Sequence, residues 1–161
     1  RVLRYLKGQP DLKTTFSSGE VALKTYCDAS YCQSELQQKS VTGYMVMICG
    51  GMVSHCTKKQ SLTACNTTES ELIALDSCAN QVLLIRSFLG ELGIKQLSPV
   101  PVLCDNAGVC HIAEAATQSS RTRHNLLVRL RRITDNVKSK HIKVAFVPVN
   151  IQKADCLTKI L

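Results

Sequence analysis

The chain has 161 residues, of which 45% are hydrophobic, so it is long enough for one domain with a single hydrophobic core. Its 20 Lys and Arg outnumber its 12 Asp and Glu, which gives a formal net charge of +8 and favours a polyanionic partner. No run of about 18 apolar residues occurs, which argues against a membrane partner, and the amino-terminal RVLRYLKG lacks the apolar stretch of a signal peptide. The nine cysteines include no C-x-x-C pair, which argues against a zinc knuckle, and we expect reduced thiols in an intracellular compartment.

The first 20 residues are predicted to be the tail of a preceding element and a linker, because RVLRYLKG is a short amphipathic stretch and QPDLKTTFSSG is linker-like. Residues 21–161 are predicted to form the domain itself. Apolar and β-branched residues predict three strands at its start, at 21–28, 41–49 and 52–57. Gly50-Gly51 is typical of a two-residue turn, so the second and third strands are predicted to form an antiparallel hairpin.

A long helix is predicted after the hairpin. Asn66 with Glu69, or Thr68 with Glu71, offers a capping box at its start, and Gly93 suits its C-terminal end. Apolar residues follow at helical spacing, interrupted by one arginine. Three of them are expected in the core: Leu72, Leu75 and Val82.

Strands and helices alternate in the second half of the chain. The predicted order is a strand at 100–104, helices at 106–116 and 121–138, a strand at 142–149 and a final helical segment. The apolar stripe of the second of these helices consists of Leu126, Leu130, Ile133 and Val137. Because a helical crossover precedes the fourth strand, the first and fourth strands are able to run parallel, which predicts an α/β fold with a mixed sheet and helices on its faces.

Four acidic residues stand where predicted elements end or begin. Asp28 and Asp105 each close a strand, Glu71 lies near the start of the long helix, and Asp155 lies in the last helical segment. Crevices at the C-terminal ends of parallel strands are the usual ligand sites of open α/β sheets. Two carboxylates about 4 Å apart repel by roughly 1–4 kcal/mol, and all-oxygen sites suit Mg²⁺ or Mn²⁺. The pattern therefore predicts metal-assisted phosphodiester chemistry.

Positive charge is concentrated between residues 121 and 140, where seven basic residues face a single acidic one. A basic flank beside an acidic centre favours a nucleic acid, and a solvated helix face is the alternative. The arginines expected to contact phosphates are Arg121, Arg123, Arg129, Arg131 and Arg132.

A series of short motifs follows in order along nearly the whole chain. They are RVLRYLKG, Tyr26-Cys27-Asp28-Ala29, Lys39-Ser40-Val41-Thr42-Gly43-Tyr44, Gly50-Gly51, Lys58-Lys59-Gln60, Thr68-Glu69-Ser70-Glu71, Cys104-Asp105-Asn106, Ser120-Arg121-Thr122-Arg123-His124, Val147-Pro148 and Ala154-Asp155-Cys156-Leu157-Thr158-Lys159. In this order the motifs resemble the ribonuclease H domain of copia-type LTR retrotransposon Pol polyproteins, and RVLRYLKG resembles the end of the upstream reverse transcriptase.

The resemblance implies a five-stranded ribonuclease H-like sheet, with a three-stranded antiparallel meander followed by parallel strands. It implies an endonuclease that cuts the RNA strand of RNA–DNA hybrids with two Mg²⁺ or Mn²⁺ ions, beside a reverse transcriptase domain, in a cytoplasmic virus-like particle or the nucleus. The family's metal-binding carboxylates correspond to Asp28, Glu71, Asp105 and Asp155, and Glu69 is a competing candidate that we assign to the helix N-terminus instead.

Two further roles follow from the resemblance. Asn106 and residues 42–44 are candidates for contacts with 2′-hydroxyl groups, which distinguish RNA from DNA. His124 matches a histidine of the family and is a candidate auxiliary residue, with capping or surface exposure as the alternative.

Some positions depart from the family pattern, among them His55, Leu72 and Ile160. These departures favour a second hypothesis, a decayed retrotransposon remnant that folds and binds nucleic acid without cleaving it. A metal-dependent DNA strand-transferase is a third hypothesis, and it fits less well because such enzymes commonly use three acids.

Overall fold

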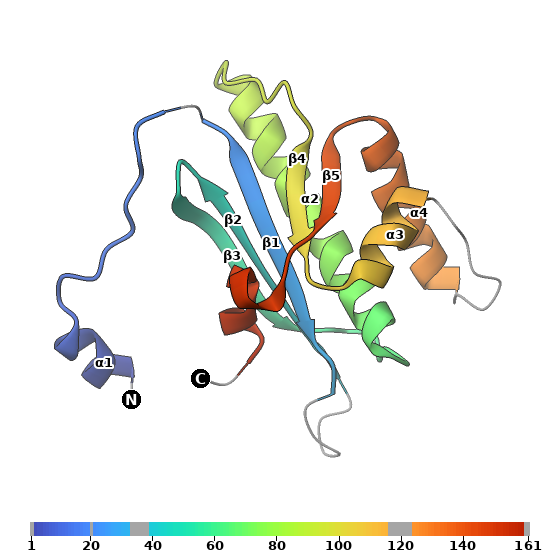
Figure 1. Ribbon diagram of the computed structural model, residues 1–161, viewed down its shortest axis with the longest axis horizontal. Helices are drawn as coiled ribbons and strands as arrows, with labels where there is room; N and C mark the ends of the chain where they lie inside the picture. Colours follow the sequence, from blue (N-terminus) through green and yellow to red (C-terminus); the bar gives the residue numbers. More distant parts are fainter. Residues whose placement is uncertain (1, 20, 33–38, 116–123, 160–161) are drawn as a thin grey trace.

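The computed structural model describes residues 2–19, 21–32, 39–115 and 124–159, and its centre is a five-stranded sheet in the order β3-β2-β1-β4-β5 (Figure 1). The strands are β1 (Leu23–Ser30), β2 (Val41–Ile48), β3 (Gly51–Lys59), β4 (Val100–Cys104) and β5 (Ile142–Phe146). The first three form an antiparallel meander, whereas β4 runs parallel to β1 and β5 runs parallel to β4. The predicted mixed sheet is confirmed.

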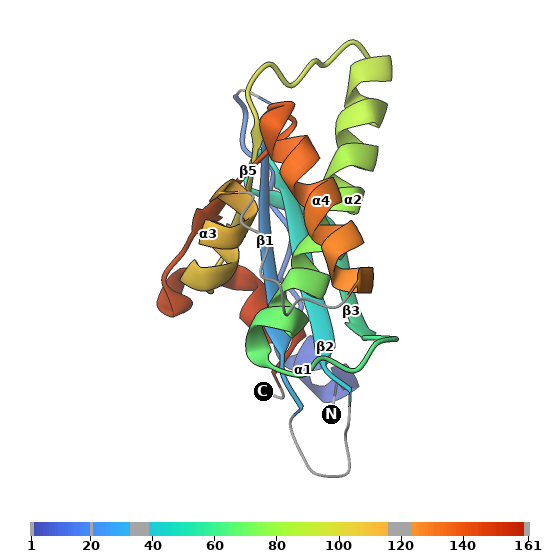
Figure 2. The same ribbon diagram turned by 90° about the vertical axis from the view of Figure 1, so that its right-hand side faces the viewer.

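Helical segments lie on both faces of this sheet. Figure 2 shows α2 (Thr67–Glu91) and α4 (His124–Lys138) together on one side of it, and α3 (Ala107–Ala115) packs against β5 and α4. On the opposite face η2 (Lys153–Leu157) lies across β1 and β2. It follows η1 (Val149–Ile151), and both are 3-10 helices, so the prediction of one helical segment at the end of the chain is only partly right.

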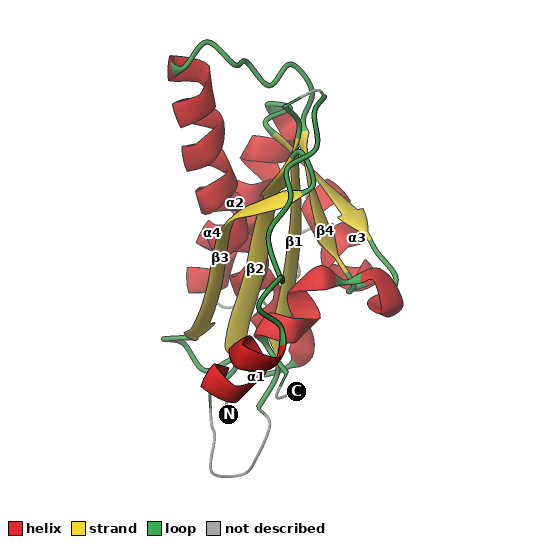
Figure 3. Ribbon diagram, turned by 90° about the vertical axis from the view of Figure 1, so that its left-hand side faces the viewer, coloured by secondary structure: helices red, strands yellow, loops and turns green. Residues whose placement is uncertain are grey.

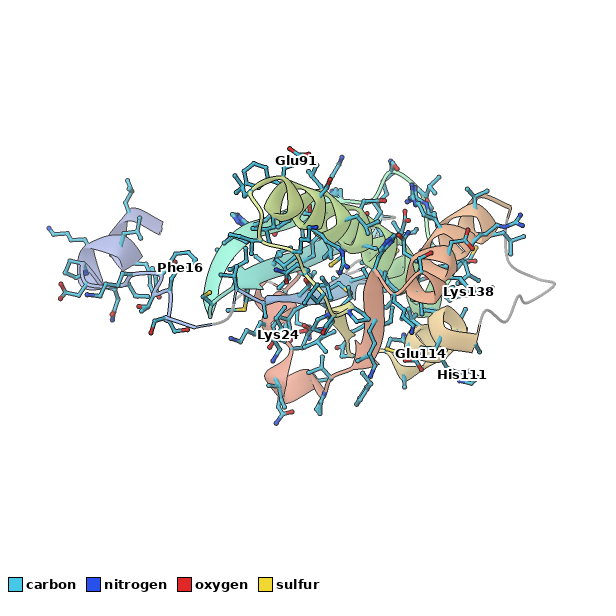
Figure 4. All side chains as sticks on the ribbon, turned by 90° about the horizontal axis from the view of Figure 1, so that it is seen from above. Phe16, Lys24, Glu91, His111, Glu114 and Lys138 are labelled. Carbon is cyan, nitrogen blue, oxygen red and sulfur yellow. The ribbon has the colours of Figure 1, made fainter. Side chains whose placement is uncertain are left out.

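The amino-terminal helix α1 (Val2–Gly8) lies apart from the sheet (Figure 1), at the end of an extended linker that passes in front of the strands in the view of Figure 3. The linker is attached at the β2–β3 turn, where the backbone N–H of Ser17 donates to the Cys49 carbonyl at 2.8 Å. The Phe16 ring, labelled in Figure 4, lies over Gly51 beside the same turn. The linker therefore has a fixed point of contact with the domain.

The β2–β3 hairpin is confirmed, but its turn lies one residue earlier than predicted. Ile48 pairs with Gly51, so the two turn residues are Cys49 and Gly50, and Gly51 already belongs to β3. Both turn residues have positive φ, 50° for Cys49 and 80° for Gly50, which is the geometry of a type I′ turn. The prediction placed both glycines in the turn, whereas a cysteine takes the first position.

The ends of β1 and β5 also differ from the prediction. β1 continues to Ser30, opposite Val41, so Asp28 lies inside the strand rather than at its end. β5 stops at Phe146, two residues before Pro148, which lacks the N–H that a strand would use.

The two faces of the sheet have separate cores. Beneath α2 and α4 the side chains of Leu75, Val82, Val102 and Ile133 are fully buried, which confirms the predicted apolar stripes. A smaller cluster on the other face is built around Tyr26, Met47 and Ala154.

Helix α2 starts as predicted, because the Asn66 side chain accepts from the Glu69 N–H at 2.8 Å and Glu69 Oε2 accepts from the Cys65 N–H at 2.8 Å. It ends at Glu91, just before Gly93. By length and composition α2 could span a membrane, but half of its apolar window is buried in this domain, so its apolar residues serve the core.

Candidate metal centre

Four carboxylates from distant parts of the chain converge at one end of the sheet. Asp28 lies near the end of β1, and Asp105 directly follows β4. Since β1 and β4 are parallel neighbours, with Tyr26 opposite Leu103, both carboxylates reach the same edge. Glu71 comes from the second turn of α2 and Asp155 from η2 on the opposite face.

Asp105 joins these residues into one site. Carboxylate oxygens of Asp28, Asp105 and Asp155 all lie within 4.8 Å of one another. An oxygen of Glu71, an oxygen of Asp105 and Cys104 Sγ form a second group within the same limit. Glu69 belongs to neither group, because its carboxylate caps the start of α2. The geometry therefore favours Glu71 over Glu69 as the metal-binding glutamate, as predicted.

Burial makes this concentration of negative charge costly. Asp28 is 4% exposed and Glu71 is 7% exposed. Burial raises the pKa of Glu71 to about 9, with further contributions from the negative charges of Cys104, Asp28 and Asp105. Burial also raises the pKa of Asp28 and of Asp105, and for Asp105 the neighbouring Asp28 adds to the effect. A bound divalent cation would remove this penalty, because it favours the charged form of every carboxylate around it.

The residues after η2 support the site from the second face of the sheet. Thr158 Oγ1 donates a hydrogen bond to Asp28 Oδ2, which opposes the rise in the pKa of Asp28. Lys159 Nζ lies 2.6 Å from both carboxylate oxygens of Asp155. The Thr57 hydroxyl donates to the Leu157 carbonyl at 3.0 Å and so fixes this segment to β3. We refer to residues 153–159 as the C-terminal strap.

The strap comes close to β2 at one glycine. A Cβ atom on Gly43 would lie 2.5 Å from Thr158 Cγ2, which is too short for a real contact, and 3.1 Å from Leu157 Cβ, which is unusually tight. Gly43 is the strand partner of Asp28. The absence of a side chain at this position therefore allows the strap to reach Asp28.

The structure gives several of the predicted nucleic-acid residues another partner. Arg129 Nη1 lies 2.5 Å from Asp76 Oδ2, and Arg132 Nε lies 2.9 Å from Asp76 Oδ1. Asp76 is 1% exposed, so these contacts connect α4 to the buried face of α2. Arg131 is exposed. Asn106 Oδ1 accepts from the Val109 N–H at 3.1 Å and caps α3 beside Asp105.

Three further predictions fall where the structure gives no side-chain information. Arg121 and Arg123 lie outside the described residues, and only the backbone of His124 is described, as the first residue of α4.

Sequence reasoning missed a cavity lined by basic residues. Its volume is about 340 Å³, and it lies between the β2–β3 hairpin, α2 and α4. Lys58, Lys59 and Arg129 supply its positive charge. Gln60 joins its wall to α2, because Gln60 Nε2 donates to the Thr42 hydroxyl at 3.1 Å and to the Ser70 carbonyl at 2.9 Å. The Lys58-Lys59-Gln60 motif was the available signal, but its position relative to α4 was not visible from the sequence.

No family model matches the chain, but individual proteins do. The retrovirus-related Pol polyprotein from transposon TNT 1-94 of Nicotiana tabacum is 33% identical over 160 residues, 99% of this chain and 12% of that protein. The Pol polyprotein from transposon RE2 of Arabidopsis thaliana is 32% identical over 160 residues, 99% of this chain and 11% of that protein. The chain thus spans about an eighth of the length of these relatives.

Solved structures with the same fold include two ribonucleases H and a viral protease-reverse transcriptase. LC11-RNase H1 in complex with an RNA/DNA hybrid superimposes with a TM-score of 0.63 at 12% identity, over 84% of this chain and 92% of that one. The N-terminal RNase H domain of a Mycobacterium tuberculosis protein gives 0.57 at 15% identity, over 86% and 91%. The foamy viral protease-reverse transcriptase with an RNA/DNA hybrid gives 0.58 at 12% identity, over 88% and 20%. The chain therefore has a ribonuclease H fold and is homologous along nearly its whole length to one segment of the retrovirus-related Pol polyproteins of plant transposons.

Proposed function

We propose that this chain is a metal-dependent endonuclease that hydrolyses the RNA strand of RNA–DNA hybrids during retrotransposon reverse transcription. The observation that carries the proposal is the convergence of Asp28, Glu71, Asp105 and Asp155 at the C-terminal end of β1 and β4 in a ribonuclease H fold. The choice of substrate is supported by two structures of this fold that hold an RNA/DNA hybrid.

The donor set suits two Mg²⁺ or Mn²⁺ ions. Asp28, Asp105 and Asp155 offer only oxygen, the ligand that these hard cations prefer, and Glu71 completes the acidic set. Glu71 is buried and forms no ion pair with a cationic side chain among the described residues. When bound, such ions activate a water molecule and stabilise the charge on the leaving oxygen.

The protein's own groups would orient this site. Asp28 is fixed from two sides, because its strand is paired with β2 and β4 and its carboxylate receives the Thr158 hydroxyl. Lys159 balances the charge of Asp155, and its side chain is 53% exposed, so it is free to turn away when a cation or a phosphate approaches. The C-terminal strap thus positions two of the four carboxylates.

The basic cavity is the natural place for the nucleic-acid backbone. Lys58, Lys59 and Arg129 would bind phosphates there, and the ion pair with the buried Asp76 orients the Arg129 side chain. Thr42 belongs to the wall of the cavity and its hydroxyl accepts from Gln60, so residues 42–44 remain proposed contacts with 2′-hydroxyl groups. Arg121, Arg123, Arg131 and Asn106 remain proposed contacts, and an upstream reverse transcriptase domain is proposed as the partner that presents the hybrid.

Labelled RNA–DNA hybrid incubated with purified protein and Mg²⁺ tests the proposal. We expect cleavage of the RNA strand by the wild type and loss of cleavage in Asp28→Asn. Asp135→Asn serves as the matched control, because Asp135 is an exposed carboxylate on α4. Hybrid binding without cleavage by the wild type would refute the enzyme and support the remnant, whereas equal cleavage by wild type and Asp28→Asn would point to a contaminating nuclease.

A salt titration of hybrid binding tests the proposed phosphate contacts. Each lost contact should reduce the slope of log K against log salt by roughly one. We expect this reduction in Lys58→Ala, and an unchanged slope would remove Lys58 from the proposed interface.

A further inference from the structure

A second kind of donor lies inside the acidic centre. Cys104 Sγ is 3.9 Å from Glu71 Oε2, and these atoms and a carboxylate oxygen of Asp105 lie within 4.8 Å of one another. The backbone N–H of Asn106 donates to the same sulfur at 3.5 Å. The three side chains thus form a mixed sulfur–oxygen group that magnesium chemistry does not require.

This group has the dimensions of a tetrahedral site. With Zn–S near 2.3 Å and Zn–O near 2.1 Å, neighbouring ligand atoms around zinc are roughly 3.4–3.6 Å apart. The present separations reach that range with shifts of about 1 Å or less. Asp105 is only partly buried, so the group reaches the surface of the domain at this residue.

Burial supplies the driving force. Glu71 is 93% removed from solvent, and among the residues that the structure describes no cationic side chain pairs with it. Its contacts are the Cys104 thiol and the backbone of Ala29. Burial disfavours the charged form of Glu71 unless a cation lies beside it, so a divalent cation at this group would hold Glu71 as a carboxylate ligand.

We propose that Cys104, Glu71 and Asp105 bind a thiophilic divalent cation such as Zn²⁺ or Cd²⁺. Thiolate ligands select such ions over magnesium, which keeps to oxygen. Cys104 binds such an ion as its thiolate. Because Glu71 and Asp105 also belong to the magnesium set, the thiophilic ion and magnesium exclude each other. This exclusion rests on the function proposed above, whereas the binding of the thiophilic ion does not.

Cadmium is the probe, because a thiolate–cadmium bond absorbs in the ultraviolet. All nine cysteines are free, so a background with Cys65→Ser and Cys156→Ser removes the two exposed thiols. In that background we compare Cys104→Ala with Cys78→Ala, a matched change since both thiols are fully buried. We expect one equivalent of cadmium to bind, with an affinity lowered at least about tenfold by Cys104→Ala and unchanged by Cys78→Ala.

Equal cadmium binding by both variants, or no saturable absorption band at all, overturns the site. If thermal unfolding shows that Cys104→Ala does not fold, Glu71→Gln decides, because it keeps every thiol and replaces a charged carboxylate ligand with a neutral amide. We then expect a weaker band at equal cadmium, and an unchanged titration refutes the proposal.

Addition of magnesium separates this proposal from the nuclease. If millimolar magnesium lowers the apparent affinity for cadmium, the two ions share Glu71 and Asp105 as ligands. A Cys104-dependent cadmium site that magnesium leaves untouched keeps the thiophilic site and counts against the magnesium centre. If no Cys104-dependent cadmium site is found but magnesium-dependent cleavage is intact, the magnesium centre is kept and the thiophilic site is rejected.

Discussion

Replacing Glu71 with glutamine should stabilise the metal-free protein at neutral pH. Burial raises the pKa of Glu71 to about 9, above its ordinary value of 4.5. A carboxyl group whose pKa is raised on folding stabilises the protein fully below its unfolded pKa, and this stabilisation is lost as pH rises toward the folded pKa. Glutamine, which resembles the protonated acid in shape, does not titrate.

The size of the effect follows from the proton balance. Between pH 4.5 and 9 the folded state holds about one proton more than the unfolded state at this group. The free energy of unfolding of the wild type should then fall by about 1.4 kcal/mol per pH unit relative to Glu71→Gln. Accumulated up to pH 7, the difference is on the order of 3 kcal/mol, and Glu71 is buried deeply enough that solvent screening takes little of it.

Urea unfolding in a chelating buffer at several values of pH between 5 and 8 measures this difference. Added Mg²⁺ should stabilise the wild type and have a smaller effect on Glu71→Gln, because a ligand that binds only the folded state raises its stability. A difference between the two proteins that stays constant with pH would refute the reasoning, since it would mean that Glu71 titrates alike in both states.

Two predictions concern the residues that support the site. The double variant Arg129→Ala/Arg132→Ala should lose about 3–5 kcal/mol, because it leaves Asp76 charged and buried, whereas Asp76→Ala should cost less since both arginines are partly exposed. Urea unfolding compares the two, and a larger loss for Asp76→Ala would contradict the account. Gly43→Val should displace the C-terminal strap and reduce hybrid cleavage at least about tenfold. Gly90→Val, where a new Cβ meets nothing within 4 Å, should retain cleavage, and equal activity of both variants would exclude a role for the strap.

The sequence was sufficient for the features that depend on local patterns. The hairpin followed from apolar and β-branched residues around two glycines, and the start of α2 followed from two possible capping boxes, of which Asn66 with Glu69 is the one that forms. The neighbourhood of Asp28 and Asp105 followed from one topological rule, that a helical crossover returns the chain to a parallel strand. Placing the turn at Gly50-Gly51 was wrong by one residue, because glycine preference does not reveal that Cys49 adopts positive φ.

Features that depend on contacts between distant segments could not be predicted. Asp76 resembles any polar residue in an apolar helix until α4 brings Arg129 and Arg132 against it. The arginines were therefore assigned wholly to nucleic acid, although two of them also hold the fold together. Thr158 and Lys159 were visible only as parts of a motif, because their action on the carboxylates depends on how the strap crosses β2.

Anomalous scattering from a crystal grown in Mn²⁺ tests the central claim most directly. The account predicts manganese density bounded by Asp28, Glu71, Asp105 and Asp155, with Lys159 no longer paired to Asp155. Clear density for the four carboxylates without manganese between them, at concentrations that support hybrid cleavage, would contradict it.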